Sequence, residues 1–241
     1  MIPHCILAVA ICASVPGIQD GLAETGPDSA PTIFRWHSGA LNCFREDRHD
    51  GKFLYTLDTP DAKFTLMVDG AELEKSHRTS EPIFTLHLAV RLFGQGPLTI
   101  RSDQAALQLV LHHGVWITPL DPAVLARRIR DKTNRLALQT AKYIEQHPSK
   151  QAAARENLEE QEKLAAQWIE FLYSESLPGE TMTALSPKTS GWIYFPAEAK
   201  GVRTWKLREE FVLRISLEGA TVEFPFRLPP EDSPVLMHRP E

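Results

Sequence analysis

The feature that most constrains the fold is the strict alternation of side chains over residues 83–93. One parity is apolar throughout (Phe84, Leu86, Leu88, Val90, Leu92), and the other includes Thr85, His87 and Arg91. Successive side chains of a β-strand point to opposite faces, so this pattern predicts a strand with one buried and one solvent-facing side. Gly94 and Pro97 follow it and end the strand.

Further short strands are predicted on both sides of this stretch. Each is a run of apolar and β-branched residues that a turn signal bounds, and together they cover 32–36, 52–57, 63–68, 98–101, 106–111, 115–118, 191–195, 205–217 and 221–227. The aromatic run 190–196 (Ser-Gly-Trp-Ile-Tyr-Phe-Pro) and the later 223–226 (Glu-Phe-Pro-Phe) are typical of the closing strands of a secreted β-sandwich.

The periodicity changes from strand-like to helical at Asp121. Asp121 is a favourable N-cap, and Pro122 is well tolerated at the first helical position. Apolar residues then recur at helical spacing in two arms that His147-Pro148 separates. The first arm presents Leu125, Ile129, Leu136, Thr140 and Tyr143, and the second presents Leu158, Ala165, Trp168 and Leu172. Basic residues dominate 127–135 and acidic residues dominate 156–162, which favours two helices packed against each other.

These elements predict a mainly β fold: an immunoglobulin-like antiparallel β-sandwich over 32–228 with an α-helical hairpin inserted at 121–173. Residues 24–31 have the composition of a flexible leader, and 229–241, with four prolines, that of a loose tail.

The N-terminus predicts export. Residues 5–15 are free of charge and have the length of a signal-peptide core, and Gly21-Leu22-Ala23 offers small residues for cleavage after Ala23. A signal peptide at 1–23 would place the protein in the periplasm or outside the cell. Cleavage would leave Cys43 as the single cysteine, so that no internal disulfide could form.

The order of motifs over residues 63–228 resembles a group of exported bacterial immunoglobulin-like sandwich proteins of unknown function. The resemblance rests on Val90-Arg91-Leu92, a strand pair at 107–117, a Pro-led helical segment, 177–181 (Leu-Pro-Gly-Glu-Thr), 190–196 and 223–226. An additional loop at 182–189 is a departure from that pattern. The resemblance implies a fold and a cell-envelope setting, and it implies no catalytic or binding residue.

No catalytic constellation, cofactor site or metal site is predicted. The sequence has no Gly-x-Ser-x-Gly elbow, and Gly94-Gln95-Gly96-Pro97 has the wrong context for a phosphate-binding loop. His37, Cys43 and His49 are too widely spaced for a typical zinc site and lack an obvious fourth ligand, which leaves a metal-handling protein or metal-dependent hydrolase as the weakest alternative. His112 and His113 are adjacent on a strand end and so point apart.

A net charge of −5 gives no reason to expect nucleic acid as a partner. We therefore expect a non-enzymatic protein-interaction or structural module that acts through the hairpin, with Trp168, Phe171, Arg127 and Arg128 as candidate partner-binding residues in the envelope. The alternative is a carbohydrate-binding module, in which Trp36, Trp116, Trp192 or Trp205 would stack on sugar rings.

Overall fold

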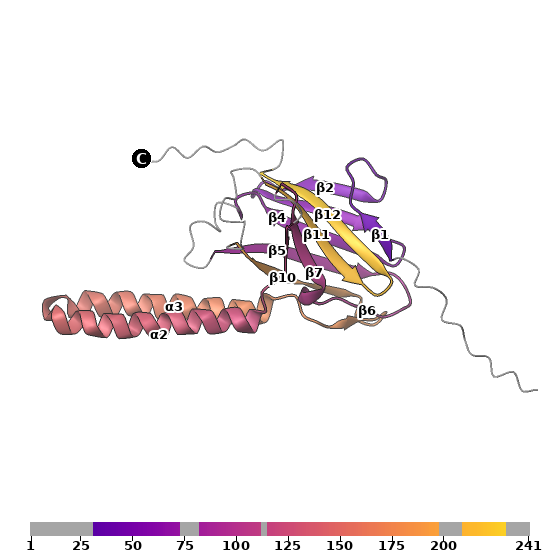
Figure 1. Cartoon of the computed structure of the whole chain (residues 1–241). Coiled ribbons are helices and arrows are strands. Elements are labelled where there is room, and N and C mark those ends of the chain that lie inside the picture. The colour runs from indigo at the N-terminus through magenta and orange to yellow at the C-terminus, as the bar shows by residue number, and fades with distance from the viewer. Residues whose placement is uncertain (1–30, 73–81, 112–114, 198–208, 230–241) are drawn as a thin grey trace, which may run out of the picture. The chain divides into compact units, whose positions relative to one another are not determined.

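A computed structural model describes residues 31–72, 82–111, 115–197 and 209–229 (Figure 1). It confirms the mainly β class: two five-stranded sheets form the body of the fold, and two long helices form most of the rest of its regular structure. The predicted signal peptide, most of the leader and tail, the His112-His113 pair and Trp205 lie outside the described residues.

The first sheet, which we call sheet A, has the strand order β1-β12-β11-β7-β8. Its strands are β1 (Thr32–Arg35), β12 (Ala220–Leu228), β11 (Glu209–Leu217), β7 (Ala105–Leu109) and β8 (Val115–Ile117). All neighbours are antiparallel except β1 and β12, which are parallel. Pro225 of β12 lies just beyond Glu223, the last residue that β1 pairs with, so its missing N–H is not needed on that side.

The second sheet, sheet B, has the order β10-β5-β4-β3-β2, and all its pairs are antiparallel. Its strands are β10 (Lys188–Pro196), β5 (Ile83–Leu92), β4 (Ala62–Asp69), β3 (Lys52–Asp58) and β2 (Cys43–Asp47). A short ribbon joins β6 (Leu98–Thr99) to β9 (Thr181–Met182), and a 3-10 turn, η1, covers Ser102–Gln104.

The two sheets share one hydrophobic core. The buried parity of β5 lies in it with apolar residues of both sheets, as the alternation over 83–93 predicts. Aromatic rings make contacts from sheet to sheet: Phe84 of β5 stacks on Phe211 of β11 at 5.1 Å between centroids, and Tyr55 of β3 lies 6.2 Å from Phe226 of β12. This burial is the main source of stability, because no disulfide is formed by the single described cysteine.

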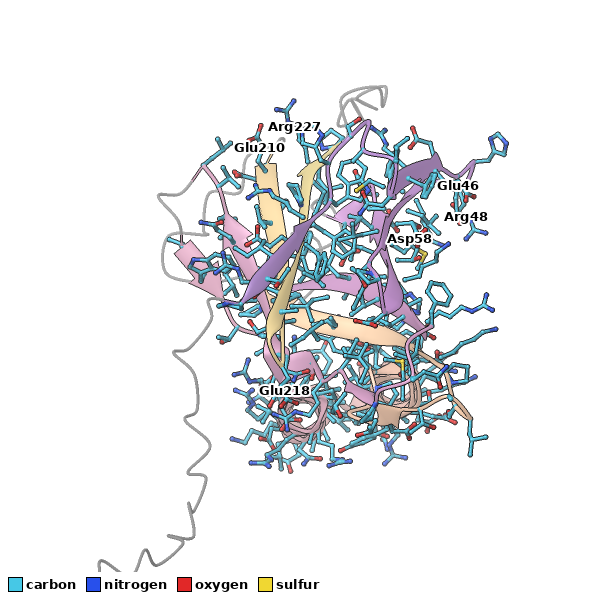
Figure 2. All side chains as sticks on the ribbon, turned by 90° about the vertical axis from the view of Figure 1, so that its right-hand side faces the viewer. Glu46, Arg48, Asp58, Glu210, Glu218 and Arg227 are labelled. Carbon is cyan, nitrogen blue, oxygen red and sulfur yellow. The ribbon has the colours of Figure 1, made fainter. Side chains whose placement is uncertain are left out.

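Ion pairs join neighbouring strands on the outer face of sheet A. Glu223 of β12 is only 4% exposed and lies between two arginines. It accepts hydrogen bonds from Arg35 of β1 at 3.1 Å and from Arg214 of β11 at 2.7 and 2.9 Å. Figure 2 shows a second pair on this sheet, Glu210 and Arg227, which are directly opposite each other on β11 and β12.

The first prediction concerns Glu223. Its replacement by Gln removes a carboxylate that two guanidinium groups share, so Glu223→Gln should lower the free energy of unfolding by about 1–3 kcal/mol. Urea denaturation followed by tryptophan fluorescence measures this difference. Glu218→Gln, at the exposed turn between β11 and β12, is the matched control and should change stability by less than about 0.5 kcal/mol. Equal effects of the two substitutions would contradict a structural role for Glu223.

The helical segment forms two antiparallel helices that lie side by side (Figure 1). They are α2 (Pro122–Gln146) and α3 (Gln151–Glu175), with a 3-10 turn, η2 (Pro148–Lys150), between them. The predicted start is confirmed: Asp121 is the N-cap and accepts a hydrogen bond from the Ala123 N–H at 2.8 Å, and Pro122 opens the helix. The second helix begins two residues later than the predicted Ser149, because η2 takes up those residues.

Several local predictions are wrong. Strand β2 and strand β9 were not expected, the segment predicted as a strand over 98–101 is a strand only at 98–99, and Trp168 does not belong to the buried face of its helix. In α3 the partly or fully buried residues are Gln151, Ala154, Leu158, Ala165, Ile169 and Leu172. Ile169 faces α2 in place of Trp168, since residues four apart on a helix share a face and Ile169 lies four after Ala165.

Candidate binding surface at the base of the helical hairpin

Both ends of the hairpin are fixed to β10, the edge strand of sheet B. Before α2, the Leu120 N–H donates to the Tyr194 carbonyl at 2.7 Å. After α3, the Leu177 N–H donates to the Trp192 carbonyl at 3.0 Å, and Ser176 forms an isolated parallel bridge with Trp192. Carbonyl groups on the free edge of the sheet thus accept hydrogen bonds from the chain where it leaves and re-enters the sandwich.

A small apolar cluster, separate from the main core, seals this attachment. Leu125, Ala126 and Leu172 from the two helices pack with Tyr194 of β10, and all four are at most 1% exposed. Ile83, Leu120, Ile129, Ile169 and Trp192 surround them. Within the described structure, Leu125, Ala126 and Leu172 are the only fully buried residues of α2 and α3. The two helices are therefore fully buried only at their base.

Gly191 lets the segment that leaves α3 approach the edge strand. A Cβ at this position would lie 2.4 Å from both the Cα and the backbone nitrogen of Leu177. Backbone atoms cannot move aside as a flexible side chain can, so any larger residue would push Ser176 and Leu177 off the strand. The glycine of the aromatic motif 190–196 is therefore explained by the hairpin that crosses it.

The second prediction follows from this contact. Gly191→Ala should destabilise the protein by about 1–3 kcal/mol, because the added methyl group overpacks the hairpin attachment. Gly96→Ala is the matched control, since a Cβ there has no atom within 4 Å and the backbone is not in the left-handed region. Thermal unfolding by circular dichroism compares the two variants. A Gly191→Ala protein that melts together with Gly96→Ala would show that the close approach is not required.

Four aromatic rings form a continuous surface where α3 meets sheet B; we call it the aromatic corner. Trp168 and Phe171 of α3 are edge to face at 5.9 Å between centroids. Phe171 lies 6.3 Å from Trp192 of β10, which in turn is 5.1 Å from the His87 ring of β5. Trp168 and Phe171 remain 48% and 37% exposed, whereas Trp192 and His87 are half-buried.

The structure separates the four sequence-predicted binding residues into two pairs. Trp168 and Phe171 contact each other and belong to the aromatic corner. Arg127 and Arg128 are exposed on the first turns of α2, within three residues of Leu125 in the base cluster. Leu164 is also exposed and precedes Trp168 by four residues, so Leu164, Trp168 and Phe171 form one apolar stripe along α3.

The metal hypothesis on His37, Cys43 and His49 finds no support in the geometry. Within the described residues no group of three potential ligands is close enough to hold an ion. Cys43 begins β2 as a buried residue, and its sulfur accepts a hydrogen bond from the His37 N–H at 3.3 Å. His49 follows the other end of that strand, and five extended residues span about 17 Å.

Of the four tryptophans considered as sugar platforms, three are described. Trp36 is buried in the core against Tyr55, so this prediction is wrong for it. Trp116 is partly exposed, but the Arg214 guanidinium covers its ring at 4.3 Å from the centroid. Trp192 is the one that lies on a partly open surface. His87 and Phe171 were not weighed as its neighbours, because only the pairing of β10 with β5 and the return of α3 bring them together.

Burial lowers the pKa of His87, and the negative charge of Glu175 opposes this effect in part. A histidine whose folded-state pKa is lowered resists a proton that the unfolded chain accepts. Below the unfolded value of about 6.5, stability is therefore lost as the pH falls. His87 packs on Trp192, so we expect this loss of stability to affect the aromatic corner.

The third prediction tests this pH dependence. The free energy of unfolding should fall more steeply between about pH 7 and pH 5 in the wild-type protein than in His87→Gln, which cannot take up the proton. Denaturant unfolding at each pH gives the two slopes. His49→Gln, at an exposed turn, should keep the wild-type slope. If His87→Gln and wild type showed parallel curves, His87 would not contribute.

Comparison with known proteins gives little similarity. No protein-family model matches the chain, and no curated protein is significantly similar to it. A solved structure of a "putative lipoprotein (ycdA)" from Bacillus subtilis is similar over 76% of this chain and 38% of that chain, with 12% identity and a TM-score of 0.31. The chain thus spans well under half of that protein's length, and a TM-score this low does not establish a shared fold.

Neither α2 nor α3 has the sustained apolar character that crossing a bilayer requires, and the described ranges contain no other helix that could do so.

Proposed function

We propose that this chain is an exported, non-enzymatic interaction module that docks a protein partner on the aromatic corner. The observation that carries the proposal is the exposure of Trp168 and Phe171 on a surface continuous with Trp192. Large aromatic side chains dominate the energetics of protein interfaces when they are clustered and can be desolvated together. An i, i+4, i+7 stripe such as Leu164, Trp168 and Phe171 is also the spacing by which a helix binds a groove.

The exposed arginines of α2 favour a partner with apolar side chains flanked by acidic ones. Arg127 and Arg128 are exposed near the base of α2. Arginine at an interface rim binds carboxylates in a bidentate manner and steers association. An amphipathic acidic segment of a protein would meet both features.

Export is proposed from the sequence of residues 1–23, and the absence of enzymatic activity from the absence of a nucleophile elbow or phosphate-binding loop in the sequence. The immunoglobulin-like assignment is also a proposal. Two mainly antiparallel sheets around one core support it, whereas the uninterrupted meander β2-β3-β4-β5 departs from the strand distribution of immunoglobulin domains.

The fourth prediction is positional. The photoreactive residue benzoylphenylalanine at position 168 should form a cross-link to a protein in cells of the source organism. The same residue in place of Leu138, an exposed apolar residue of α2, should not. Trp168→Ala/Phe171→Ala should abolish co-purification of the cross-linked protein, while Leu138→Ala should leave it intact.

Cross-links from both positions at equal yield, or from position 138 alone, would rule out the aromatic corner as the docking site. Mass spectrometry of the cross-linked peptide checks the chemistry of the partner. A peptide without acidic residues near the attachment point would contradict the role assigned to Arg127 and Arg128.

A further inference from the structure

Away from the hairpin, the outer face of sheet B carries a row of three cationic side chains. Lys188 of β10 lies directly opposite Arg91 of β5, and Arg91 lies directly opposite Lys63 of β4. Neighbouring strands are about 4.8 Å apart, so the row extends across about 10 Å of the sheet. Side chains at these positions share one face because every second residue of a strand does.

Small side chains next to this row leave a groove. Its volume is about 300 Å³, and it is lined by Lys63, Thr65, Ala89, Val90, Arg91, Lys188, Thr189 and Ser190. The register places Ser190, Ala89 and Thr65 opposite one another, one row along from the cations. Thr65 also shares a hydroxyl hydrogen bond of 3.2 Å with Thr56 of β3, so two hydroxyl groups remain in place at this level of the sheet.

The positive charge in the groove is only partly compensated. Lys63 forms an ion pair with Asp58 at 3.4 Å, and Asp58 of β3 lies directly opposite Lys63. The Arg91 guanidinium lies 5.6 Å from the centre of the Phe93 ring, a contact that leaves its charge in place. Within the described ranges, no ion pair joins Arg91 or Lys188 to a carboxylate. Three cations therefore face one carboxylate.

We propose that this groove binds an acidic polysaccharide. Carboxylate groups of the ligand would lie on Arg91 and Lys188, and its hydroxyl groups would exchange hydrogen bonds with Ser190 and Thr65, which can both donate and accept. Trp192 follows Ser190 by two residues on the same face of β10, about 7 Å further along the strand. A groove floor of small and hydroxylated residues favours a polyhydroxylated chain over a peptide, which requires pockets for its side chains.

This inference is independent of the proposed function, because it concerns another class of ligand and depends on Arg91 and Lys188, which take no part in the aromatic corner. The fifth prediction tests it with polygalacturonate, a polymer with one carboxylate per sugar, titrated by isothermal calorimetry into the full chain. Arg91→Gln/Lys188→Gln should weaken binding by about tenfold or more, as expected for the loss of charge-assisted hydrogen bonds. Arg130→Gln/Lys142→Gln removes the same charge from exposed positions of the hairpin and should leave the affinity unchanged.

Binding should also weaken as the salt concentration rises, since exposed charges are screened within about 10 Å at 0.1 M. Circular dichroism melts confirm that both double variants are folded. Failure of the wild-type protein to bind polygalacturonate would overturn the proposal, as would an equal loss in the two double variants, which would indicate attraction by net charge alone. Equal affinity for polyglutamate would overturn it in favour of an acidic peptide. None of these results bears on cross-linking at position 168, so the two proposals fail separately.

Discussion

The attachment of the hairpin to the edge of β10 is the contact on which the rest of this surface depends. Two backbone hydrogen bonds, from Leu120 to Tyr194 and from Leu177 to Trp192, fix the two ends of a long insertion to the same strand. Gly191 immediately precedes the acceptor Trp192, and the chain at Leu177 passes directly over it. The fully buried residues of α2 and α3 all lie at this attachment. This short stretch of strand therefore fixes where Trp168 and Phe171 lie relative to the sheet.

The two sheets use their outer faces differently. On sheet A, Glu223 is enclosed by Arg35 and Arg214, and Arg214 also covers Trp116, so charge and aromatic surface satisfy each other. On sheet B, the hairpin covers one end of the outer face, and the described structure leaves Arg91 and Lys188 without carboxylate partners at the other. Groups already paired within the fold must be separated before they can bind a ligand, whereas unpaired ones need not be. We therefore place both proposed sites on sheet B.

The sequence predicts an element well where the residues of that element alone determine it, through a regular apolar face or a capping residue. The alternation over 83–93 gave β5, and Asp121-Pro122 gave the start of α2. Strand β2 was missed because only Cys43 of its five residues is buried, so an edge strand of this kind carries no alternation. Trp168 was placed on the wrong face because Trp168 and Ile169 are both apolar, and only the packing against Ile129 and Leu125 selects Ile169.

The same distinction applies to the sites. Trp168 and Phe171 could be chosen from the sequence as candidate binding residues, and His87 and Arg91 could be placed on the solvent-facing side of their strand. The residues that contact them could not be predicted from the sequence. The Trp192–His87 contact and the Lys188–Arg91–Lys63 row both depend on the register between β10, β5 and β4, and β10 lies far from the other two strands in the sequence. Pairing register is decided by the whole buried face of a sheet and is not encoded in either strand alone.

Magnitudes limit what the aromatic corner can do alone. Complete burial of a large apolar side chain contributes about 1.5–3 kcal/mol. Since Trp168 and Phe171 are 48% and 37% exposed, covering what remains would contribute about 1.3–2.6 kcal/mol in total, or a factor of about 10–80 in affinity. Micromolar binding requires about 8 kcal/mol. A specific partner must therefore extend beyond the corner. Leu164 continues the apolar stripe along α3, and Arg127 and Arg128 are exposed at the base of α2. An anchor of this size determines where a partner binds, and the charged groups around it determine which partner.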